Sequence, residues 1–406
     1  MKQRSERILI IGGGAAGFFA AIRCAEENKT AEVSIWEQAK APLGKVKISG
    51  GGRCNVTHAC FEPAELVNHY PRGKKALLGP FHKFMTGDTI AWFEDRGVPL
   101  KIESDGRMFP TSDKSESIIQ CLSESARKAG ISIYLKKAAR NLTLSAEDWE
   151  VTANDGEQYL YDKVLVASGS AKLMYAVLDR LGHTIEEPVP SLFTFNIEDP
   201  LIKDLAGQTH LANVEVEGSQ LSETGNMLIT HWGLSGPPIL RLSAWGARYL
   251  YAQNYHFKLS INFLPSWTEE KALMHLYGLR QDHPSTFLSK KVWPEFTNRL
   301  WHRILELADI PKEKRWADMS NALCKSLATT LTSYQLQVDG KSTFKEEFVT
   351  CGGVKLDEVD FRTMQSRKFP NLFFAGEVLD IDAVTGGFNF QAAWTTGWIA
   401  GGAMAK

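Results

Sequence analysis

A short apolar strand runs directly into a glycine-rich turn near the start of the chain. Residues 8–17 read Ile-Leu-Ile-Ile-Gly-Gly-Gly-Ala-Ala-Gly, which places Gly12, Gly14 and Gly17 at the spacing G-x-G-x-x-G. In a dinucleotide-binding fold, the first glycine permits the tight turn, the second lets the backbone approach a pyrophosphate, and the third lets helix and strand pack closely. The apolar residues 18–22 then predict a helix, whose N-terminal N–H groups attract phosphate.

A second predicted strand carries the acidic residue that such a site requires. The apolar residues 33–36 end in Glu37, which lies 20 residues beyond Gly17. At this distance a dinucleotide fold places the carboxylate that binds a ribose hydroxyl. Because strand, glycine turn, helix and acid follow in the required order, the sequence predicts a dinucleotide site and not an ordinary glycine turn.

The composition is typical of a soluble globular protein with more than one domain. The chain has 406 residues, of which 44% are hydrophobic and 23% charged. The formal net charge is −1, so no overall field draws the molecule to nucleic acid or to an acidic membrane. No apolar segment reaches the length of about 18 residues that a membrane span needs, and glycines interrupt the apolar run that follows the first basic residues. We therefore expect a cytoplasmic protein.

Six cysteines are scattered along the chain without the spacing of a zinc site or of a C-x-x-C redox motif. Cys54 and Cys60 come after the second predicted strand, in the place where some flavin reductases carry a redox-active pair. Six residues along a helix rise by roughly 9 Å and face nearly opposite sides, whereas a disulfide needs Cα atoms within about 7 Å. We expect free, reduced thiols and no metal site.

The first 190 residues alternate strands and helices. Apolar runs predict further strands at 131–134 and 164–167, and apolar residues at helical spacing predict a helix at 115–129. The strand at 164–167 runs into a glycine turn, as the first strand does. A strand at 371–375 repeats this arrangement near the other end of the chain.

The middle of the chain has a different pattern, with short alternating apolar runs followed by helical spacing. One helix is predicted to begin at Pro294, and the last helix to run from about Asn389 to Ala403 and to end in a glycine pair. The sequence thus predicts three parts: a discontinuous α/β domain (1–190 and 345–406), a β-rich insertion forming an antiparallel sheet or small barrel (191–266 with 333–344), and a helical insertion (267–332).

Three further segments combine glycine with polar or charged residues: 45–55, 105–110 and 375–391. The first places three glycines beside Ser49, Arg53 and Asn55, which offers backbone donors and a fixed positive charge to an anionic or carbonyl group. The last leads into the final helix, whose N-terminus directs a positive partial charge at any bound ligand.

With these motifs the chain resembles the YhiN/BaiN-like FAD-binding flavoproteins, a family of NAD(P)/FAD-dependent oxidoreductases. The resemblance covers essentially the whole chain and includes the segments 230–237 and 350–354. It implies a Rossmann-type FAD-binding domain with an inserted β-barrel-like domain and an inserted helical domain. It also implies flavin-dependent C=C reduction, since family members are linked to this reaction on bile-acid intermediates and on uridine in large-subunit ribosomal RNA.

The resemblance also implies which residues contact FAD. For the ADP half these are Gly12, Gly14, Gly17 and Glu37. For the pyrophosphate and flavin they are Lys45, Ser49, Gly51, Arg53, Cys54 and Asn55. For the ribityl chain and ring they are Gly376, Glu377, Gly387, Phe388 and Asn389. The predicted cofactor-binding set is completed by Ala15, Ala16, Ala167 and Gly169.

Several polar residues have a plainer structural alternative. Arg53 has the alternative of pairing with a carboxylate, although its neighbouring glycines favour a cofactor role. Cys54 is more simply a packed small residue, but it is our one candidate proton donor if it lies over the flavin. We favour flavin contact for Glu377, a capping role at the last helix for Asp380, and a packed position for His231.

Only one segment carries a complete dinucleotide fingerprint, so we expect NAD(P)H to meet the flavin transiently, unless another reductant or oxygen serves. The leading hypothesis is an FAD-dependent reductase of an electron-poor C=C bond, with uridine in ribosomal RNA as one substrate. The alternatives are an FAD-dependent reductase or oxidase of a small molecule and a non-catalytic flavin-binding redox regulator. The oligomeric state is left open.

Two sequence features favour RNA as the partner. Between Lys40 and Lys83 there are eight Lys or Arg and two Glu, a local excess of +6. Basic residues also alternate with tryptophans in the helical insertion, in the manner of a charge-plus-stacking surface: Lys290, Lys291, Trp293, Arg299, Trp301 and Arg303. The alternative is that some of these charges bind FAD phosphates and the rest are solvated surface.

Overall fold

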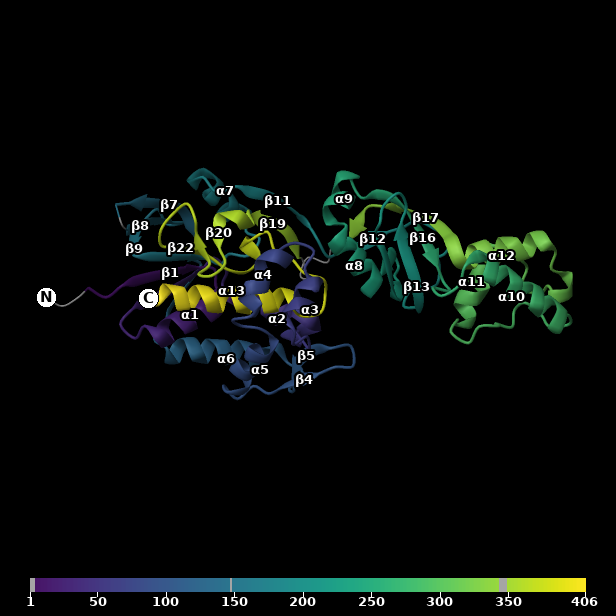
Figure 1. Cartoon of the computed structure of the whole chain (residues 1–406), viewed down its shortest axis with the longest axis horizontal. Coiled ribbons are helices and arrows are strands. Elements are labelled where there is room, and N and C mark those ends of the chain that lie inside the picture. Colours follow the sequence, from purple (N-terminus) through teal and green to yellow (C-terminus); the bar gives the residue numbers. More distant parts are fainter. Residues whose placement is uncertain (1–3, 147, 343–348) are drawn as a thin grey trace. The chain divides into compact units, whose positions relative to one another are not determined.

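The computed structural model describes residues 4–146, 148–342 and 349–406. They belong to two compact units, one comprising residues 1–190 and 345–406 and the other residues 191–344 (Figure 1). The two units are described separately below.

A seven-stranded sheet in the order β20-β21-β22-β10-β1-β2-β6 forms the centre of the first unit. Its parallel strands are β1 (Arg7–Ile11), β2 (Glu32–Glu37), β6 (Ser132–Leu135), β10 (Lys163–Val166) and β22 (Leu372–Phe374). The antiparallel strands β20 (Val359–Asp360) and β21 (Gln365–Ser366) complete one edge. Strand β1 is aliphatic throughout its buried part, as expected for a strand covered on both faces. The strands predicted at 131–134, 164–167 and 371–375 form within one residue of those bounds.

Smaller elements surround this sheet. The helices are α1 (Ala15–Glu27), α2 (Gly44–Gly52), α3 (Pro63–Leu66), α4 (Lys74–Phe81), α5 (Thr86–Glu94), α6 (Ser115–Lys128), α7 (Lys172–Leu181) and α13 (Phe388–Met404), with the short 3-10 turns η1 (Val67–His69), η3 (Leu356–Glu358) and η4 (Gly376–Val378). The antiparallel strands are β3 (Thr57–His58), β4 (Leu100–Ile102) and β5 (Arg107–Pro110); β7 (Ala139–Ser145), β8 (Asp148–Ala153) and β9 (Gln158–Tyr161); and β11 (Ile185–Pro190) with β19 (Thr350–Val354).

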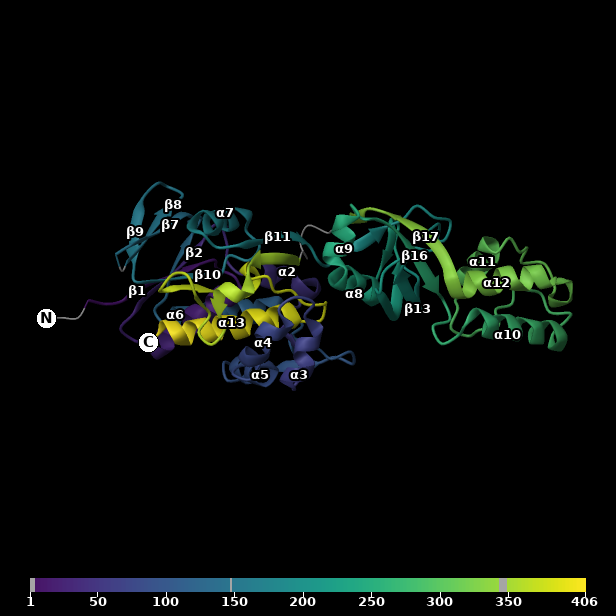
Figure 2. The same ribbon diagram turned by 45° about the horizontal axis from the view of Figure 1, so that its top comes forward.

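The first and the last helices of the chain lie side by side, as Figures 1 and 2 both show. Two glycines of α13 permit this contact. A Cβ atom on Gly397 would lie 2.6 Å from the Ala16 carbonyl oxygen, and one on Gly401 would lie 2.4 Å from that of Ala20. Helix α13 agrees within one residue at each end with the helix predicted from about Asn389 to Ala403, and Gly401 serves helix packing.

The second unit contains a seven-stranded antiparallel sheet in the order β17-β16-β13-β14-β15-β12-β18. Its strands are β12 (Thr194–Asn196), β13 (Thr209–Val216), β14 (Ser222–Ile229), β15 (Gly233–Ser235), β16 (His256–Asn262), β17 (Tyr334–Asp339) and β18 (Lys341–Ser342). Its helices are α8 (Pro237–Trp245), α9 (Ala247–Ala252), α10 (Glu269–Asp282), α11 (Asn298–Leu307) and α12 (Asn321–Ser333), with the 3-10 turn η2 (Trp316–Asp318). One apolar core joins sheet and helices.

The start of α11 differs from the prediction at Pro294. The helix begins at Asn298, after the N-cap residue Thr297, whose hydroxyl oxygen accepts a hydrogen bond from the Leu300 N–H at 3.2 Å. The Thr297 hydroxyl accepts a hydrogen bond from a backbone N–H of the first turn, whereas a proline side chain has no acceptor to offer. Thr297 therefore fixes the start of the helix.

Candidate functional site

The N-terminal loop (residues 12–17) follows β1 and includes the first residues of α1. Its back packs against backbone atoms, and its front is open. Gly12 has φ +115°, and a Cβ atom there would lie 2.4 Å from the Ala167 carbonyl oxygen. A Cβ atom on Gly17 would lie 2.0 Å from the Gly12 carbonyl oxygen. Only glycine fits at these two positions. A Cβ atom on Gly14, by contrast, would have no neighbour within 4 Å, so the front of the loop is free to receive a ligand.

The start of α1 has the electrostatics of an anion site. Its N-cap Gly14 provides no side-chain acceptor, and no acidic residue lies in the first turn, which begins with Ala15 and Ala16. The N–H groups of this turn therefore keep their partial positive charge and their hydrogen-bonding capacity for a ligand. Together with the open face at Gly14, this loop forms a cradle that fits a pyrophosphate.

Glu37 lies against this loop, at the end of β2. Its Oε2 accepts a hydrogen bond from the Gly13 N–H at 2.8 Å, and its Oε1 accepts one from the Ala39 N–H at 2.7 Å. The two backbone donors fix the carboxylate beside the glycine turn. The fold thus brings together the glycines and the acid that the sequence spacing singles out.

The Lys45 ammonium and the Glu377 carboxylate form an ion pair that joins α2 to η4. Oε1 of Glu377 also accepts a hydrogen bond from the Thr350 N–H at 3.1 Å. Gly169 lies beside the same carboxylate, because a Cβ atom there would be 3.6 Å from Oε2. Gly376 in turn lies next to the N-terminal loop, because a Cβ atom there would be 2.9 Å from the Ala16 Cβ. Predicted cofactor residues from four separate segments therefore meet at this point.

The three glycines of α2 share an unusual backbone. Gly50, Gly51 and Gly52 have φ values of +57°, +68° and +84°, which are all left-handed. A Cβ atom on Gly50 would lie 2.9 Å from the Phe109 ring, whereas positions 51 and 52 face open space. The Ser49 carbonyl oxygen closes the bend by accepting a hydrogen bond from the Cys54 N–H at 3.0 Å. The helix that begins at Gly44 is thus kinked into a concave backbone surface.

Arg53 pairs with carboxylates, which is the structural alternative to a cofactor role. Its Nη1 donates to a Glu103 carboxylate oxygen at 2.6 Å and lies 3.4 Å from an Asp113 oxygen. The guanidinium also lies 3.9 Å from the centre of the Phe109 ring, in cation–π contact. These partners engage the charge of Arg53 within the protein, so its role in cofactor binding stays a prediction.

Cys54 is fully buried, and burial raises the pKa of its thiol to about 12. A thiol with so high a pKa is a poor proton donor near neutral pH. This environment favours the packed alternative, and the catalytic use of Cys54 stays a prediction. All six cysteines are buried and free, as expected.

Asn55 links the concave segment to the start of α13. Its side-chain Oδ1 accepts a hydrogen bond from the Gly387 N–H at 3.0 Å, and its Nδ2 donates to the Thr57 carbonyl oxygen at 3.1 Å. Gly387 has φ +95°, and a Cβ atom there would lie 2.5 Å from the same Thr57 oxygen. The two predicted binding segments are therefore neighbours in the fold.

Two histidines that the sequence analysis did not single out pack against Phe388. The Phe388 ring stacks on His58 with centroids 4.4 Å apart and on His69 with centroids 4.1 Å apart. His58 Nδ1 lies 3.0 Å from the Gly386 carbonyl oxygen, and the Tyr70 hydroxyl donates to the Phe388 carbonyl oxygen at 2.6 Å. Phe388 is therefore held by two ring contacts and at its backbone.

The C-terminal loop (residues 379–387) is held by further side chains. Asn389 donates to the Ala383 carbonyl oxygen at 3.1 Å and accepts from the Ala383 N–H at 3.0 Å, which engages both ends of its amide. The fully buried Asp382 carboxylate forms an ion pair with Arg72. Asn389 thus shapes the loop, and its predicted contact with the cofactor stays a prediction.

Two subsidiary predictions are wrong. Asp380 does not cap α13, because its carboxylate accepts a hydrogen bond from the Gly352 N–H at 2.8 Å and the N-cap of the helix is Gly387. His231, expected to be packed, is exposed on the second unit. The sequence around Asp380 does not reveal its hydrogen-bond partner Gly352. The sequence around His231 does not reveal that its side chain is left exposed.

The predicted charge-plus-stacking surface in the helical insertion is also wrong. Trp293 and Trp301 are only 6% and 0% exposed, since both belong to the core of the second unit. Arg299 and Arg303 donate to backbone carbonyl oxygens of the segment 200–204. Buried indoles offer no face to a nucleic-acid base, so this segment cannot bind RNA by stacking.

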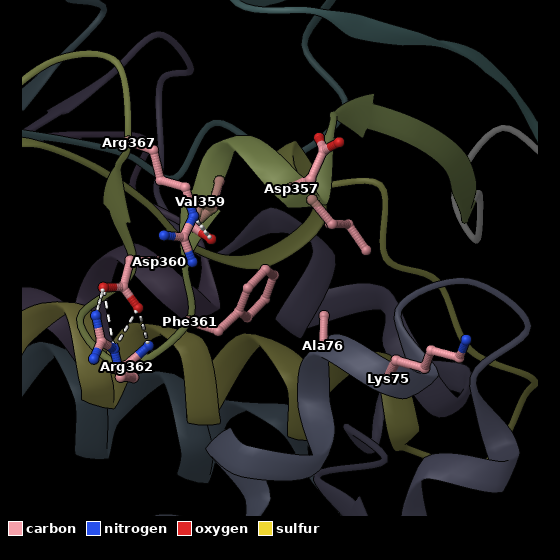
Figure 3. Close-up of a pocket in the computed structure, with 9 residues that line it drawn as sticks. Lys75, Ala76, Asp357, Val359, Asp360, Phe361, Arg362 and Arg367 are labelled. Carbon is pink, nitrogen blue, oxygen red and sulfur yellow. Dashed lines mark hydrogen bonds and ion pairs between the residues drawn. The ribbon is translucent and has the colours of Figure 1, made fainter.

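A pocket of about 550 Å³ lies elsewhere in the first unit, between α4 and the turn that joins β20 to β21 (Figure 3). Its charged lining is partly self-neutralised, because Arg362 pairs with Asp360 at 2.7 Å. None of the predicted cofactor residues lines it. The candidate site is therefore the group of segments around the N-terminal loop and not this pocket.

Comparison with known proteins was made for the whole chain. The family model described as "HI0933-like protein Rossmann domain" matches residues 6–403. A 3-dehydro-bile acid delta(4,6)-reductase from Clostridium scindens is 30% identical to this chain and covers 98% of it and 99% of the relative. A ribosomal RNA dihydrouridine synthase from Escherichia coli is 29% identical and covers 96% of each chain.

Among solved structures, the chain is similar to 3-ketosteroid-delta4-(5alpha)-dehydrogenase from Rhodococcus jostii RHA1. The TM-score is 0.53 at 12% identity, with 100% of this chain and 98% of the other covered. This similarity concerns the fold. None of the helices in the described part of the chain has the length and apolarity needed to cross a membrane.

Proposed function

Because the chain belongs to the HI0933-like Rossmann-domain family, we propose that it is an FAD-dependent oxidoreductase that reduces an electron-poor C=C bond. The observation that carries the proposal is the N-terminal loop, which is open at Gly14, faces the positive end of α1 and has Glu37 fixed at its side. Both relatives described above have names that denote C=C reduction, one on a bile acid and one on uridine in ribosomal RNA.

The residues around the loop fit an FAD molecule. Glu37 would bind the adenosine ribose, and the N–H groups at the start of α1 would bind the pyrophosphate. The concave segment at 50–52 and the start of α13 would lie along the rest of the cofactor. FAD, when bound, supplies hydride chemistry, and the protein supplies position and electrostatics. The N-terminal N–H groups of α13 would stabilise negative charge on a neighbouring group.

For the substrate we propose uridine in large-subunit ribosomal RNA, with NAD(P)H as a transient reductant. Support comes from the family and from relatives in Escherichia coli and Haemophilus influenzae that carry this activity in their names. The second candidate is a small molecule, favoured by the 30% identity to the bile-acid reductase over nearly the whole chain.

Three measurements test these proposals. An absorbance spectrum of the purified protein, with mass analysis of the compound released on denaturation, should identify FAD. Anaerobic addition of NADH or NADPH should bleach the flavin; a bound flavin that neither reduces would favour a redox regulator. Mass spectrometry of ribosomal RNA nucleosides from cells with and without the gene should show less dihydrouridine in its absence. Unchanged dihydrouridine would favour the small-molecule substrate.

A further inference from the structure

We propose that His58 and His69 are positioning residues that hold the start of α13 in the conformation that binds FAD, by a clamp in which both rings pack against Phe388. This inference rests on the proposed function, since it concerns the cofactor that the site would hold. Neither histidine is part of a glycine motif, and neither is needed to form the central sheet.

In this clamp both imidazole rings pack against the Phe388 ring, in two directions that are nearly at right angles to each other. The planes of Phe388 and His69 make an angle of 11°, and those of Phe388 and His58 make an angle of 27°. The two imidazole centroids are 6.0 Å apart. Phe388 is only 2% exposed, so its ring cannot leave the stack without opening a cavity. The first residue of α13 is thereby fixed from two sides.

His58 makes a second contact that a stacking residue alone would not provide. Its Nδ1 lies 3.0 Å from the Gly386 carbonyl oxygen, which is an acceptor, so Nδ1 carries the proton. The ring fits here because residue 106 is glycine: a Cβ atom there would lie 2.6 Å from His58 Nε2. The imidazole therefore bonds to the turn that precedes α13 while it stacks on the residue that follows the turn.

The turn itself needs such support. Gly386 and Gly387 have φ values of +132° and +95°, and two consecutive glycines lose much conformational freedom when they are fixed. The N–H groups at the start of α13 can meet a ligand only if this turn is held in one conformation. The residues that hold it come from one stretch of chain, His58 to Tyr70, which lies more than 300 residues away in the sequence.

The test compares two nearly isosteric variants of His58. In His58→Asn the side-chain Nδ2 takes the place of Nδ1 and can still donate to Gly386. In His58→Gln the amide nitrogen takes the place of Nε2 and cannot. FAD would be titrated into each apoprotein and followed by quenching of flavin fluorescence. We expect His58→Gln to raise the Kd about tenfold and His58→Asn to leave it within about twofold of wild type.

The stacking half of the clamp has its own pair of variants. His69→Phe keeps an aromatic ring on Phe388 and should bind FAD like wild type, whereas His69→Ala should raise the Kd by about tenfold. His82→Ala, which removes an exposed histidine of the same unit, is the control and should change nothing. Equal affinities for all variants and wild type would overturn the inference.

A second readout does not depend on the cofactor. Amide hydrogen exchange in the apoproteins should be faster at residues 386–390 in His58→Gln and His69→Ala than in His58→Asn and His69→Phe. If wild type binds no FAD, the proposed function fails while this measurement still decides whether the clamp exists. Equal exchange at 386–390 in all four variants and wild type would refute the clamp.

Discussion

The N-terminal loop and the C-terminal loop are both rich in glycine and border the same candidate site, but they are held in different ways. The first is held largely by backbone contacts, since Gly12 and Gly17 are fixed by close approach to main-chain oxygen atoms, and the Glu37 side chain adds one hydrogen bond to the Gly13 N–H. The second is held by side chains, among them Arg72 from a distant segment, which pairs with Asp382, and Asn389 from the start of α13, which bonds to Ala383. A loop held by backbone contacts can be recognised from its own glycine motif. A loop held by a side chain such as that of Arg72 also depends on a residue outside its motif.

The largest effect should come from closing the space behind the N-terminal loop. In Gly17→Ala the new Cβ would lie 2.0 Å from the Gly12 carbonyl oxygen, a clash that strand and helix cannot relieve without separating. We expect a loss of at least about 4 kcal/mol in the free energy of unfolding, measured by urea denaturation and circular dichroism. Gly14→Ala is the matched control: its Cβ meets open space, so stability should stay within about 0.5 kcal/mol while FAD affinity falls. Equal losses in both variants would refute the distinction between the back and the front of this loop.

The next largest effect should come from the ion pair of the C-terminal loop. In Asp382→Ala the mostly buried guanidinium of Arg72 would lose its carboxylate, so we expect a loss of about 3 kcal/mol in the free energy of unfolding. Asp105→Ala removes a carboxylate that pairs with Arg107 but is more than half exposed, and this should cost less than about 1 kcal/mol. If the two substitutions cost the same, the C-terminal loop does not depend on its buried pair.

A smaller effect is expected at the other anchor of the C-terminal loop. Asn389→Ala removes both hydrogen bonds to Ala383 and should lower the free energy of unfolding by about 1–2 kcal/mol. Asn389→Asp keeps the acceptor for the Ala383 N–H but replaces the donor to its carbonyl oxygen with a second acceptor, so it should be no better than alanine. Wild-type stability of Asn389→Asp in thermal unfolding would show that the amide donor is dispensable.

The smallest effect should be a dependence on pH that only the C-terminal loop shows. Burial lowers the pKa of His58 and of His69 below the ordinary value of 6.5; for His58, Asp105 opposes this shift and Arg107 adds to it, and for His69 the neighbouring His58 adds to it. The unfolded chain binds these protons at a higher pH than the folded chain does. The stability that the neutral rings contribute is therefore complete above pH 6.5, and it is lost as the pH falls through the pKa values of the two histidines in the folded protein.

Hydrogen exchange at pH 7 and pH 5, corrected for the intrinsic rates, provides the measurement. Protection of residues 379–388 should decrease at pH 5, while protection of residues 12–17, which contain no titratable side chain, should not. The double variant His58→Asn/His69→Phe, which has no titrating ring in the clamp, should remove the difference. A decrease of equal size in both loops would contradict a specific effect of the histidines.

The same contrast explains how much of the structure the sequence predicts. The parallel strands appear within one residue of their predicted bounds because short, mainly apolar runs are local signals, and at β1, β10 and β22 a glycine turn follows the run. The prediction that Glu37 lies beside the N-terminal loop rests on a fixed spacing within one βαβ unit, and the fold confirms that placement. These features need no information from distant parts of the chain.

The errors concern residues whose role depends on a distant partner. Helical spacing places Trp293 and Trp301 beside basic residues, but it does not reveal that the core of the second unit covers both rings. His58 and His69 carry no motif of their own. Gly106 leaves room for the His58 ring, but its meaning is clear only once the two segments are seen together.

The pairing of α1 with α13 has a consequence for synthesis on the ribosome. Phe18 and Phe19, in the second turn of α1, are buried, and α13, one of the helices that cover α1, is the last to be made. Until translation finishes, this apolar face lacks the contacts that α13 provides. A nascent chain arrested before residue 388 should therefore be a client of hydrophobic-binding chaperones, and completion of the chain should release it.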